Sequence, residues 1–456
     1  MARDQKKSSE FDALEQINLH AAGIDVGADE IYVAVPKGCS AETVRSFATF
    51  TVDLETCAQW LKQCQVTTVA LESTGVYWIP LFEILEHHGL EVCLVNARHL
   101  KNVPGRKTDV LDCQWLQQLH TYGLLRASFR PPEELCALRA LVRQRAMLVR
   151  YRAAHIQHMQ KALQLMNIQL TQVLSDLTGV TGMRIIRAIL SGERNPHTLA
   201  SYRNGNCDHS EDDIVKALQG NYRREHLFAL RQAVELYDTY GQQIQQCDAE
   251  LEAMYRDFEP PHLPEPPSTQ PPVQRRTKRR KNQASFDLAA QLYRLAGVDL
   301  TRIDGIDALT AQVVLSEIGL DMTKWPTVKH FASWLGLCPQ NEITGGKVKR
   351  RGTAKTTNRA NTALRVAAQT LWRSNSALGT FYRRLRAKCG APVATTATAH
   401  KLARMVYFML KHRADYVDPG TQAYETQQRE RTIRNLRRQA EKLGFSLSPS
   451  DSPAVS

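Results

Sequence analysis

The chain has 456 residues, which is enough for two or three domains that each bury a core of their own. Its formal net charge of +13 favours a polyanionic partner such as nucleic acid. No apolar run is long enough to span a membrane, so membrane proteins are excluded and no membrane partner is expected. The N-terminus shows no apolar signal segment, and the ten cysteines are scattered without a C-x-x-C pair, as expected for a soluble cytosolic protein with reduced thiols.

Residues 1–17 are polar and are expected to form a flexible N-terminus. Two apolar runs follow at residues 21–26 and 31–35, and the Gly-Ala pair between them indicates a turn, so the segment predicts a β-hairpin. Asp25 lies near the end of the first predicted strand. A carboxylate inside an apolar strand costs free energy unless a metal ion or a hydrogen-bonding partner compensates it. Further carboxylates that could share a metal ion with Asp25 are therefore of interest.

Strand-like and helical runs alternate up to residue 130. This alternation is typical of an α/β sheet covered by helices, so we expect an α/β domain over residues 18–130. The predicted helices are residues 53–63, 79–88 and 109–120, and the further predicted strands are residues 67–72 and 90–95.

Three more acids stand at the ends of these predicted elements. Glu72 closes a strand, and Asp109 and Asp112 open a helix, where their spacing of three places them on one face. Acids in a first turn also suit the helix dipole, which is an alternative explanation for the two aspartates. Together with Asp25 they supply oxygen ligands from separate elements, as a site for two Mg²⁺ ions roughly 4 Å apart requires. The sequence therefore predicts Mg²⁺ bound by Asp25, Glu72, Asp109 and Asp112.

A basic loop precedes the helix that begins at Asp109. Its positive side chains could neutralise nucleic-acid phosphates beside the metal site, or they could belong to a solvated loop, and the sequence leaves both alternatives open. The basic residues singled out are Arg98, Lys101, Arg106 and Lys107.

Residues 131–258 are expected to form a helical, coiled-coil middle region. Apolar residues follow three- and four-residue steps at 156–170 and again, as a sustained heptad seam, at 230–258. The two helices could pack against each other within one chain, or they could form a contact between two subunits.

Residues 259–285 form a predicted proline-rich basic linker. Its seven prolines prevent a helix and favour an extended spacer. Six of the seven residues at 275–281 are basic, including Arg279 and Arg280. This run predicts a flexible arm that binds nucleic-acid phosphates, with a solubilising tether as the alternative.

Residues 286–420 are expected to form a mostly α C-terminal domain, followed by a charged tail at 421–456 that is helical at best to residue 443. Residues 342–420 hold sixteen Lys and Arg against three acids, a concentration better explained by phosphate contacts than by solubility, with a solvated face as the alternative. Two further basic segments, 381–386 and 400–404, continue a basic face, and we expect their aromatic residues to lie in the core. The predicted nucleic-acid contacts in this domain are Lys347, Lys349, Arg350, Arg351 and Lys355.

Four segments of the chain resemble the DEDD insertion-sequence transposases, which are also called bridge-RNA-guided recombinases. The segments are residues 23–27, 71–75, 107–112 and 331–347, and the resemblance extends over about 18–160 and 290–420. It implies a RuvC-like (RNase H-type) fold for the first domain and a serine-type transposase domain at the C-terminus. It also implies strand exchange through a phosphoprotein intermediate, at a composite site in a homodimer or homotetramer. Donor and target DNA and a structured bridge RNA are the implied partners.

In that family a serine precedes the two glycines of the C-terminal motif and attacks a DNA phosphate. Thr344 stands in that position here. A threonine hydroxyl is a possible nucleophile, but the β-methyl group stiffens χ1 and crowds in-line attack. The change is compatible with an active, a weakened or a disabled enzyme.

The sequence therefore predicts a DNA transposase of a mobile insertion sequence, in a bacterial cytoplasm and at the nucleoid when it acts. Two other functions remain open. A RuvC-like, metal-dependent nuclease of the Holliday-junction type would use the same four acids to activate water and would not need Thr344. The other is a nucleic-acid-binding protein that has kept the fold of these enzymes but has no catalytic activity.

Overall fold

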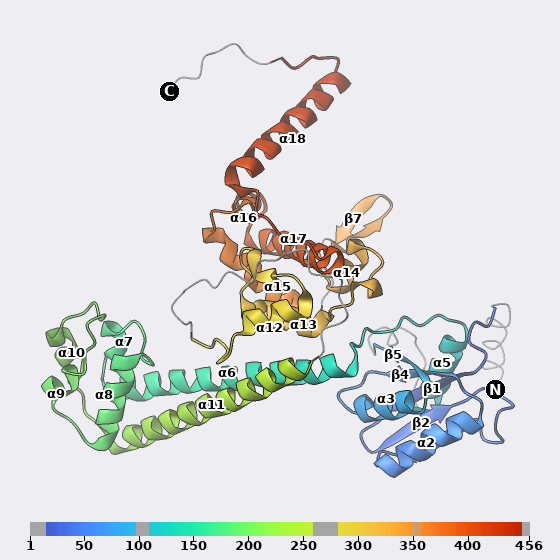
Figure 1. Ribbon diagram of the computed structural model, residues 1–456, viewed down its shortest axis with the longest axis horizontal. Coiled ribbons are helices and arrows are strands. Elements are labelled where there is room, and N and C mark those ends of the chain that lie inside the picture. The colour runs from blue at the N-terminus through green and yellow to red at the C-terminus, as the bar shows by residue number, and fades with distance from the viewer. Residues whose placement is uncertain are drawn as a thin grey trace. The chain divides into compact units, whose positions relative to one another are not determined.

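The computed structural model describes residues 15–96, 109–258, 281–350, 352–353, 356 and 358–448. The chain divides into two compact units, Met1–Arg130 and Pro131–Ser456. Figure 1 labels the elements of both. Among the described helices, none has both the length and the apolar composition that crossing a membrane requires.

The first unit is built on a five-stranded mixed sheet with the strand order β3-β2-β1-β4-β5. The strands are β1 (Ala21–Val26), β2 (Glu30–Ala34), β3 (Val44–Ala48), β4 (Thr68–Glu72) and β5 (Glu91–Val95). β1 pairs with β2 in antiparallel orientation and with β4 in parallel orientation. The helices are α2 (Thr51–Gln63), α3 (Trp78–His87) and α5 (Asp109–Thr121). The mixed sheet and its helices confirm the predicted RNase H-like fold.

Strand β1 is covered on both faces. Side chains alternate along a strand, so Ala22, Ile24 and Val26 point to one face, where they join a core that includes residues of α2 and α3. The alternate residues, Gly23 and Asp25, point to the face against which α5 packs. Asp25 therefore belongs to the α5 side of the sheet.

The second unit begins with two long helices, α6 (Glu133–Leu165) and α11 (Arg224–Asp257), which pack side by side (Figure 1). The two helices that carry the heptad seams thus pack against each other within one chain, which is the first of the two arrangements that the sequence left open. The first seam is shorter than expected, because α6 ends at Leu165 and Leu170 already begins a new helix. The short helices at this end of the pair are α7 (Leu170–Val173), α8 (Val180–Ser191), α9 (Pro196–Ala200) and α10 (Glu211–Ala217), and they share its core.

A buried ion pair joins the two long helices. The guanidinium group of Arg145 on α6 donates to the carboxylate of Asp248 on α11, and the two residues are 5% and 2% exposed. Arg145 also donates to the carbonyl oxygen of Asn282 at 3.0 Å, and the amide of Ser285 donates to Asp248 at 3.0 Å. Residues 281–285, the end of the predicted linker, are thus anchored on the helix pair.

The C-terminal part of the second unit is mostly helical, as predicted. Its elements are α12 (Leu288–Ala296), η1 (Leu300–Arg302), α13 (Ala308–Ile318), η2 (Met322–Lys324), α14 (Val328–Trp334), β6 (Glu342–Thr344), β7 (Lys347–Arg350), α15 (Arg359–Thr370), η3 (Leu371–Arg373), α16 (Ala377–Cys389), α17 (Ala391–His412) and α18 (Gly420–Lys442). The last of these is the helix expected in the charged tail.

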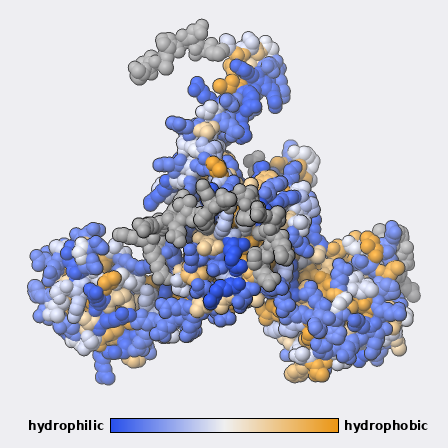
Figure 2. Space-filling view, viewed as in Figure 1, coloured by the Kyte–Doolittle hydropathy of each residue, from blue (hydrophilic) through white to orange (hydrophobic). Residues whose placement is uncertain are grey.

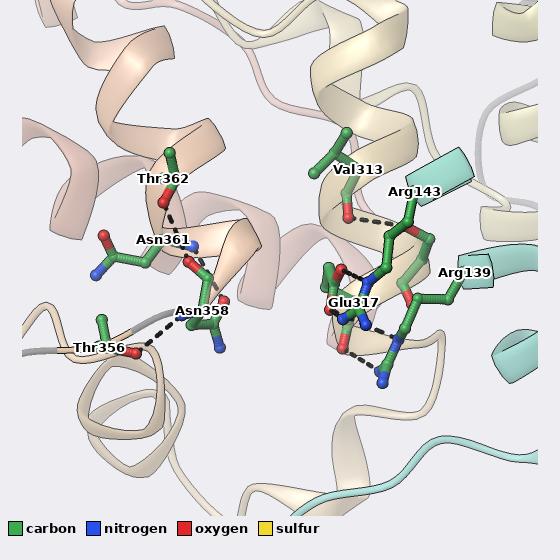
Figure 3. A network of polar contacts seen from close by, with 9 residues as sticks. Arg139, Arg143, Val313, Glu317, Thr356, Asn358, Asn361 and Thr362 are labelled. Carbon is green, nitrogen blue, oxygen red and sulfur yellow. Dashed lines mark hydrogen bonds and ion pairs between the residues drawn. The ribbon is translucent and has the colours of Figure 1, made fainter. Parts of the chain in front are cut away.

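Helix α13 is fixed to α6 by two arginines that converge on one glutamate (Figure 3). The Arg143 guanidinium donates to both carboxylate oxygens of Glu317, at 2.9 and 2.7 Å. Arg139 donates to the Glu317 carbonyl oxygen at 2.9 Å. Two parallel hydrogen bonds between a guanidinium and a carboxylate fix direction as well as distance, so α6 and α13 are held in register.

Candidate active site

Asp25 and Glu72 are neighbours on adjacent parallel strands. Ile24 of β1 lies opposite Leu71 of β4. The next residue of each strand, Asp25 and Glu72, therefore stands at the same edge of the sheet and points to the same face. The Thr74 hydroxyl donates to the Glu72 carboxylate at 3.1 Å, which orients that side chain.

Helix α5 reaches this edge because Gly23 has no side chain. A β-carbon at Gly23 would lie 2.2 Å from the amide nitrogen of Gln117 and 2.5 Å from the carbonyl oxygen of Cys113. The backbone of α5 thus rests directly on β1, on the face that Asp25 shares. This contact brings the first turn of α5, with Asp109 and Asp112, towards Asp25.

The charges of the other three acids act on Asp25. Its carboxyl group is half-buried, and its pKa is raised to about 6. Burial is the largest cause, and the negative charges of Glu72, Asp109 and Asp112 add to it, in that order. The structure therefore brings together the four acids that the sequence singled out.

The chemistry of this donor set fits a hard divalent cation. Within the described residues, no three His, Cys, Asp or Glu side chains form a group that could hold a metal ion. Four carboxylates are nevertheless the ligands that Mg²⁺ prefers. A nearby cation would relieve both causes of the raised pKa of Asp25, the burial of its charge and the repulsion from the other three carboxylates.

Thr344 lies in an exposed hairpin of the second unit. It ends β6 and pairs with Lys347 of β7 across Gly345 and Gly346, whose φ angles of +57° and +76° suit a two-residue hairpin turn. Thr344, Lys347 and Lys349 are all exposed, so a hydroxyl and two ammonium groups are open to solvent on one short hairpin.

Most of the other predicted nucleic-acid contacts fall where the structure gives no description. Arg350 ends β7, but its side chain is not among the described groups. The remaining residues, Arg98, Lys101, Arg106, Lys107, Arg279, Arg280, Arg351 and Lys355, lie outside the described residues.

Two clefts that the sequence did not predict lie at the base of the hairpin. At this base the amide of Gln340 donates to the carbonyl oxygen of Gly352 at 2.7 Å. The smaller, with a volume of about 560 Å³, is lined by Thr353 and residues of α15, including Arg365. The N-terminus of α15 is capped there by Asn358, drawn in Figure 3. The larger, of about 1070 Å³, also includes Thr353 and extends between α16, α17 and α18.

Comparison with known families identifies both units. A model of DEDD-type transposases, described simply as transposase, matches residues 22–168. A second model, described as transposase IS116/IS110/IS902 family, matches residues 286–383. The two matches together span more than half of the chain. The chain belongs to the IS110 family of transposases. No curated protein matches it.

As an IS110 family transposase, the protein is an enzyme and its substrates are DNA. The DEDD match contains the four acids, and the second match contains Thr344. DEDD nucleases are generally metal-dependent, in keeping with the donor set around Asp25.

Proposed function

We propose that this transposase cuts and rejoins DNA strands with a Mg²⁺ site in its first unit and a covalent hydroxyl–phosphate intermediate at Thr344 in its second. The observation that carries the metal proposal is the position of Asp25, whose half-buried carboxylate is repelled by the charges of Glu72, Asp109 and Asp112; burial first, and then these charges, raise its pKa to about 6. Bound Mg²⁺ would supply neutralisation of phosphate charge and activation of an attacking oxygen. The residues that would hold it are Asp25, Glu72, Asp109 and Asp112.

In the covalent step, the Thr344 hydroxyl attacks a phosphorus atom of the DNA backbone. The hydroxyl loses its proton, a bond forms between Oγ1 and phosphorus, and the phosphorus–oxygen bond to the adjoining deoxyribose breaks. The released sugar oxygen takes up a proton. Lys347, which pairs with Thr344, and Lys349 supply positive charge close to a phosphate bound there. Such charge stabilises the negative charge that develops in the transition state.

We also propose a structured bridge RNA as guide and a homodimer or homotetramer as the active assembly. The net charge of +13 supports a large polyanionic partner. In RNA-guided systems base pairing selects the sequence, while the protein contacts shape and backbone. Sequencing of the nucleic acid that co-purifies with the full chain tests the guide: one recurrent structured RNA is expected, and random cellular fragments would contradict it.

The covalent step is tested with end-labelled DNA, Mg²⁺ and a denaturing gel. The wild type should form a protein–DNA adduct, Thr344→Ser should form at least as much, and Thr344→Ala should form none. Thr426→Ala, which removes an exposed threonine hydroxyl on α18, is the matched control and should behave as the wild type. An adduct that survives in Thr344→Ala would place the nucleophile elsewhere.

One observation favours a second function. The position of the nucleophile holds threonine, whose β-methyl group crowds in-line attack. A hydrolytic nuclease would need only the four acids and a water molecule. It would release cut ends without any adduct and would retain full activity in Thr344→Ala, so the same gel separates the two functions.

A further inference from the structure

The larger cleft at the base of the hairpin is made by three helices. Its volume of about 1070 Å³ is slightly above the usual range for ligand sites in proteins, roughly 300–1,000 Å³. Along α17 its lining follows helical steps from Val393 through His400 and Arg404 to Phe408, so one face of that helix forms the floor. Residues of α16 and α18 form the remaining walls.

The cleft is strongly basic. It is lined by Arg384 of α16, Lys401 and Arg404 of α17, and Arg431 of α18, and none of the described residues that line it is acidic. The pKa of Lys401 is lowered by burial and then by the positive charges of Arg431 and Arg404. Positive groups that crowd one another in this way are stabilised by an anion placed between them.

The floor and walls also contain apolar and aromatic side chains. Phe408 is 42% exposed and Val393 is 51% exposed, although both belong to a helix whose other face is buried. The Lys401 ammonium group lies 4.7 Å from the centre of the Phe381 ring and 5.4 Å from that of Tyr424. A site that binds only phosphate does not need apolar and aromatic side chains, whereas unpaired bases stack on such side chains.

We propose that this cleft binds a single-stranded segment of DNA, with bases on Phe408 and Val393 and phosphates on Arg384, Arg404 and Arg431. A duplex keeps its bases stacked inside and offers mainly phosphates and sugars, so it does not use the apolar floor. DNA is the occupant because the substrates of a transposase are DNA and because the cleft opens beside the hairpin of Thr344. The inference requires neither the metal site nor covalent attachment at Thr344.

Helix α18 extends this basic track beyond the cleft. Arg434, Arg438 and Lys442 follow Arg431 in steps of three and four residues, so they continue the same face. Figure 2 shows that hydrophilic surface predominates along α18. A strand that leaves the cleft would therefore meet further phosphate-binding groups.

The first test is fluorescence anisotropy of the full chain with labelled oligo(dT), oligo(U) and a DNA duplex of equal length. Arg431→Glu should weaken binding of oligo(dT) by about tenfold, because a phosphate contact becomes a repulsion. Arg437→Glu makes the same charge change at an exposed position of α18 outside the cleft and should have a much smaller effect. Phe408→Ala should weaken the binding of oligo(dT) by about fivefold or more and leave the binding of the duplex unchanged.

Three outcomes would overturn the proposal. Arg431→Glu and Arg437→Glu could lose the same affinity for oligo(dT), or Phe408→Ala could lose the same affinity for the duplex as for the single strand. The third is a loss of affinity that is confined to oligo(U). The second test maps the contact directly with oligo(dT) that carries a photoreactive 5-iodouracil. Adducts on peptides of α17 or α18 that contain Phe408 or Tyr424 are expected. Adducts confined to other peptides would overturn the proposal even if the affinities changed as expected.

Discussion

Gly23 on β1 faces the backbone of Gln117 on α5 so closely that a β-carbon at position 23 would lie 2.2 Å from the Gln117 amide nitrogen. The helix that carries Asp109 and Asp112 can rest on the strand that carries Asp25 only because residue 23 lacks a side chain. The position of the acidic cluster thus depends on a residue that is itself chemically inert.

We expect Gly23→Ala to lower the free energy of unfolding of the first unit by about 2–4 kcal/mol, since the methyl group must push α5 away from the sheet. Hydrogen exchange of the β1 and β4 amides, followed by mass spectrometry, measures this loss for the first unit separately. Gly205→Ala is the control, because nothing lies within 4 Å of a β-carbon built there. Unchanged protection of β1 in Gly23→Ala would contradict the close contact.

Asp25→Asn should raise the melting temperature of the metal-free protein by about 2–4 °C, because a neutral amide removes a half-buried charge that three other carboxylates repel. Millimolar Mg²⁺ should stabilise the wild type but not the variant. Glu42→Gln alters a carboxylate whose side chain is 75% exposed and should respond to Mg²⁺ as the wild type does. Equal stabilisation of Asp25→Asn and the wild type by Mg²⁺ would contradict the metal assignment.

His120 makes the stability of the first unit depend on pH. The residue is 7% exposed and is hydrogen-bonded to the Thr68 hydroxyl at 2.8 Å, and burial lowers its pKa below the ordinary 6.5. As the pH falls through 6.5, His120 takes up a proton in the unfolded chain but stays neutral in the folded unit. Stability therefore decreases with falling pH until His120 is protonated in the folded unit as well. Thermal melts at pH values on both sides of 6.5 should show a smaller loss of stability in His120→Gln than in the wild type, and an equal loss in the two proteins would contradict this role of His120.

The ion pair between Arg145 and Asp248 should be far more important for stability than an exposed one. Asp248→Ala leaves a guanidinium group buried without its carboxylate, which costs about 3–5 kcal/mol. Asp238→Ala removes the partner of Arg187 in an ion pair whose side chains are 42% and 58% exposed, and it should cost less than about 1 kcal/mol. Urea denaturation followed by circular dichroism compares the two variants, and similar midpoints would contradict the buried pair.

The elements around the acidic site could be predicted from sequence because each has a strong local signal. The apolar run of β1, the hairpin turn and the alternation with helices all agree with the observed sheet. Strand β3 was missed because it is an edge strand in which only Phe47 is buried, so its alternation of apolar and polar residues is weak. The role of Gly23 could not be predicted either, since its partner on α5 is almost a hundred residues away in the sequence.

The basic cleft was not predictable because its lining comes from segments between Leu337 and Arg431 that only tertiary packing brings together. Two adjacent aromatic residues illustrate the difficulty. Tyr382 is 3% exposed and lies in the core, as expected, but Phe381 on the same helix lines the cleft. The sequence placed both in the core, and only the rotation of α16 against its neighbours separates them.

The central claim is that carboxylates from β1, β4 and α5 share a divalent cation. Anomalous diffraction from crystals grown with Mn²⁺ in place of Mg²⁺ tests this claim most directly. A manganese peak within about 2.0–2.3 Å of an Asp25 oxygen, with oxygens of at least two of the other three acids also bound, is the predicted result. A peak away from Asp25, or none at this cluster while Mn²⁺ is bound elsewhere, would contradict the claim.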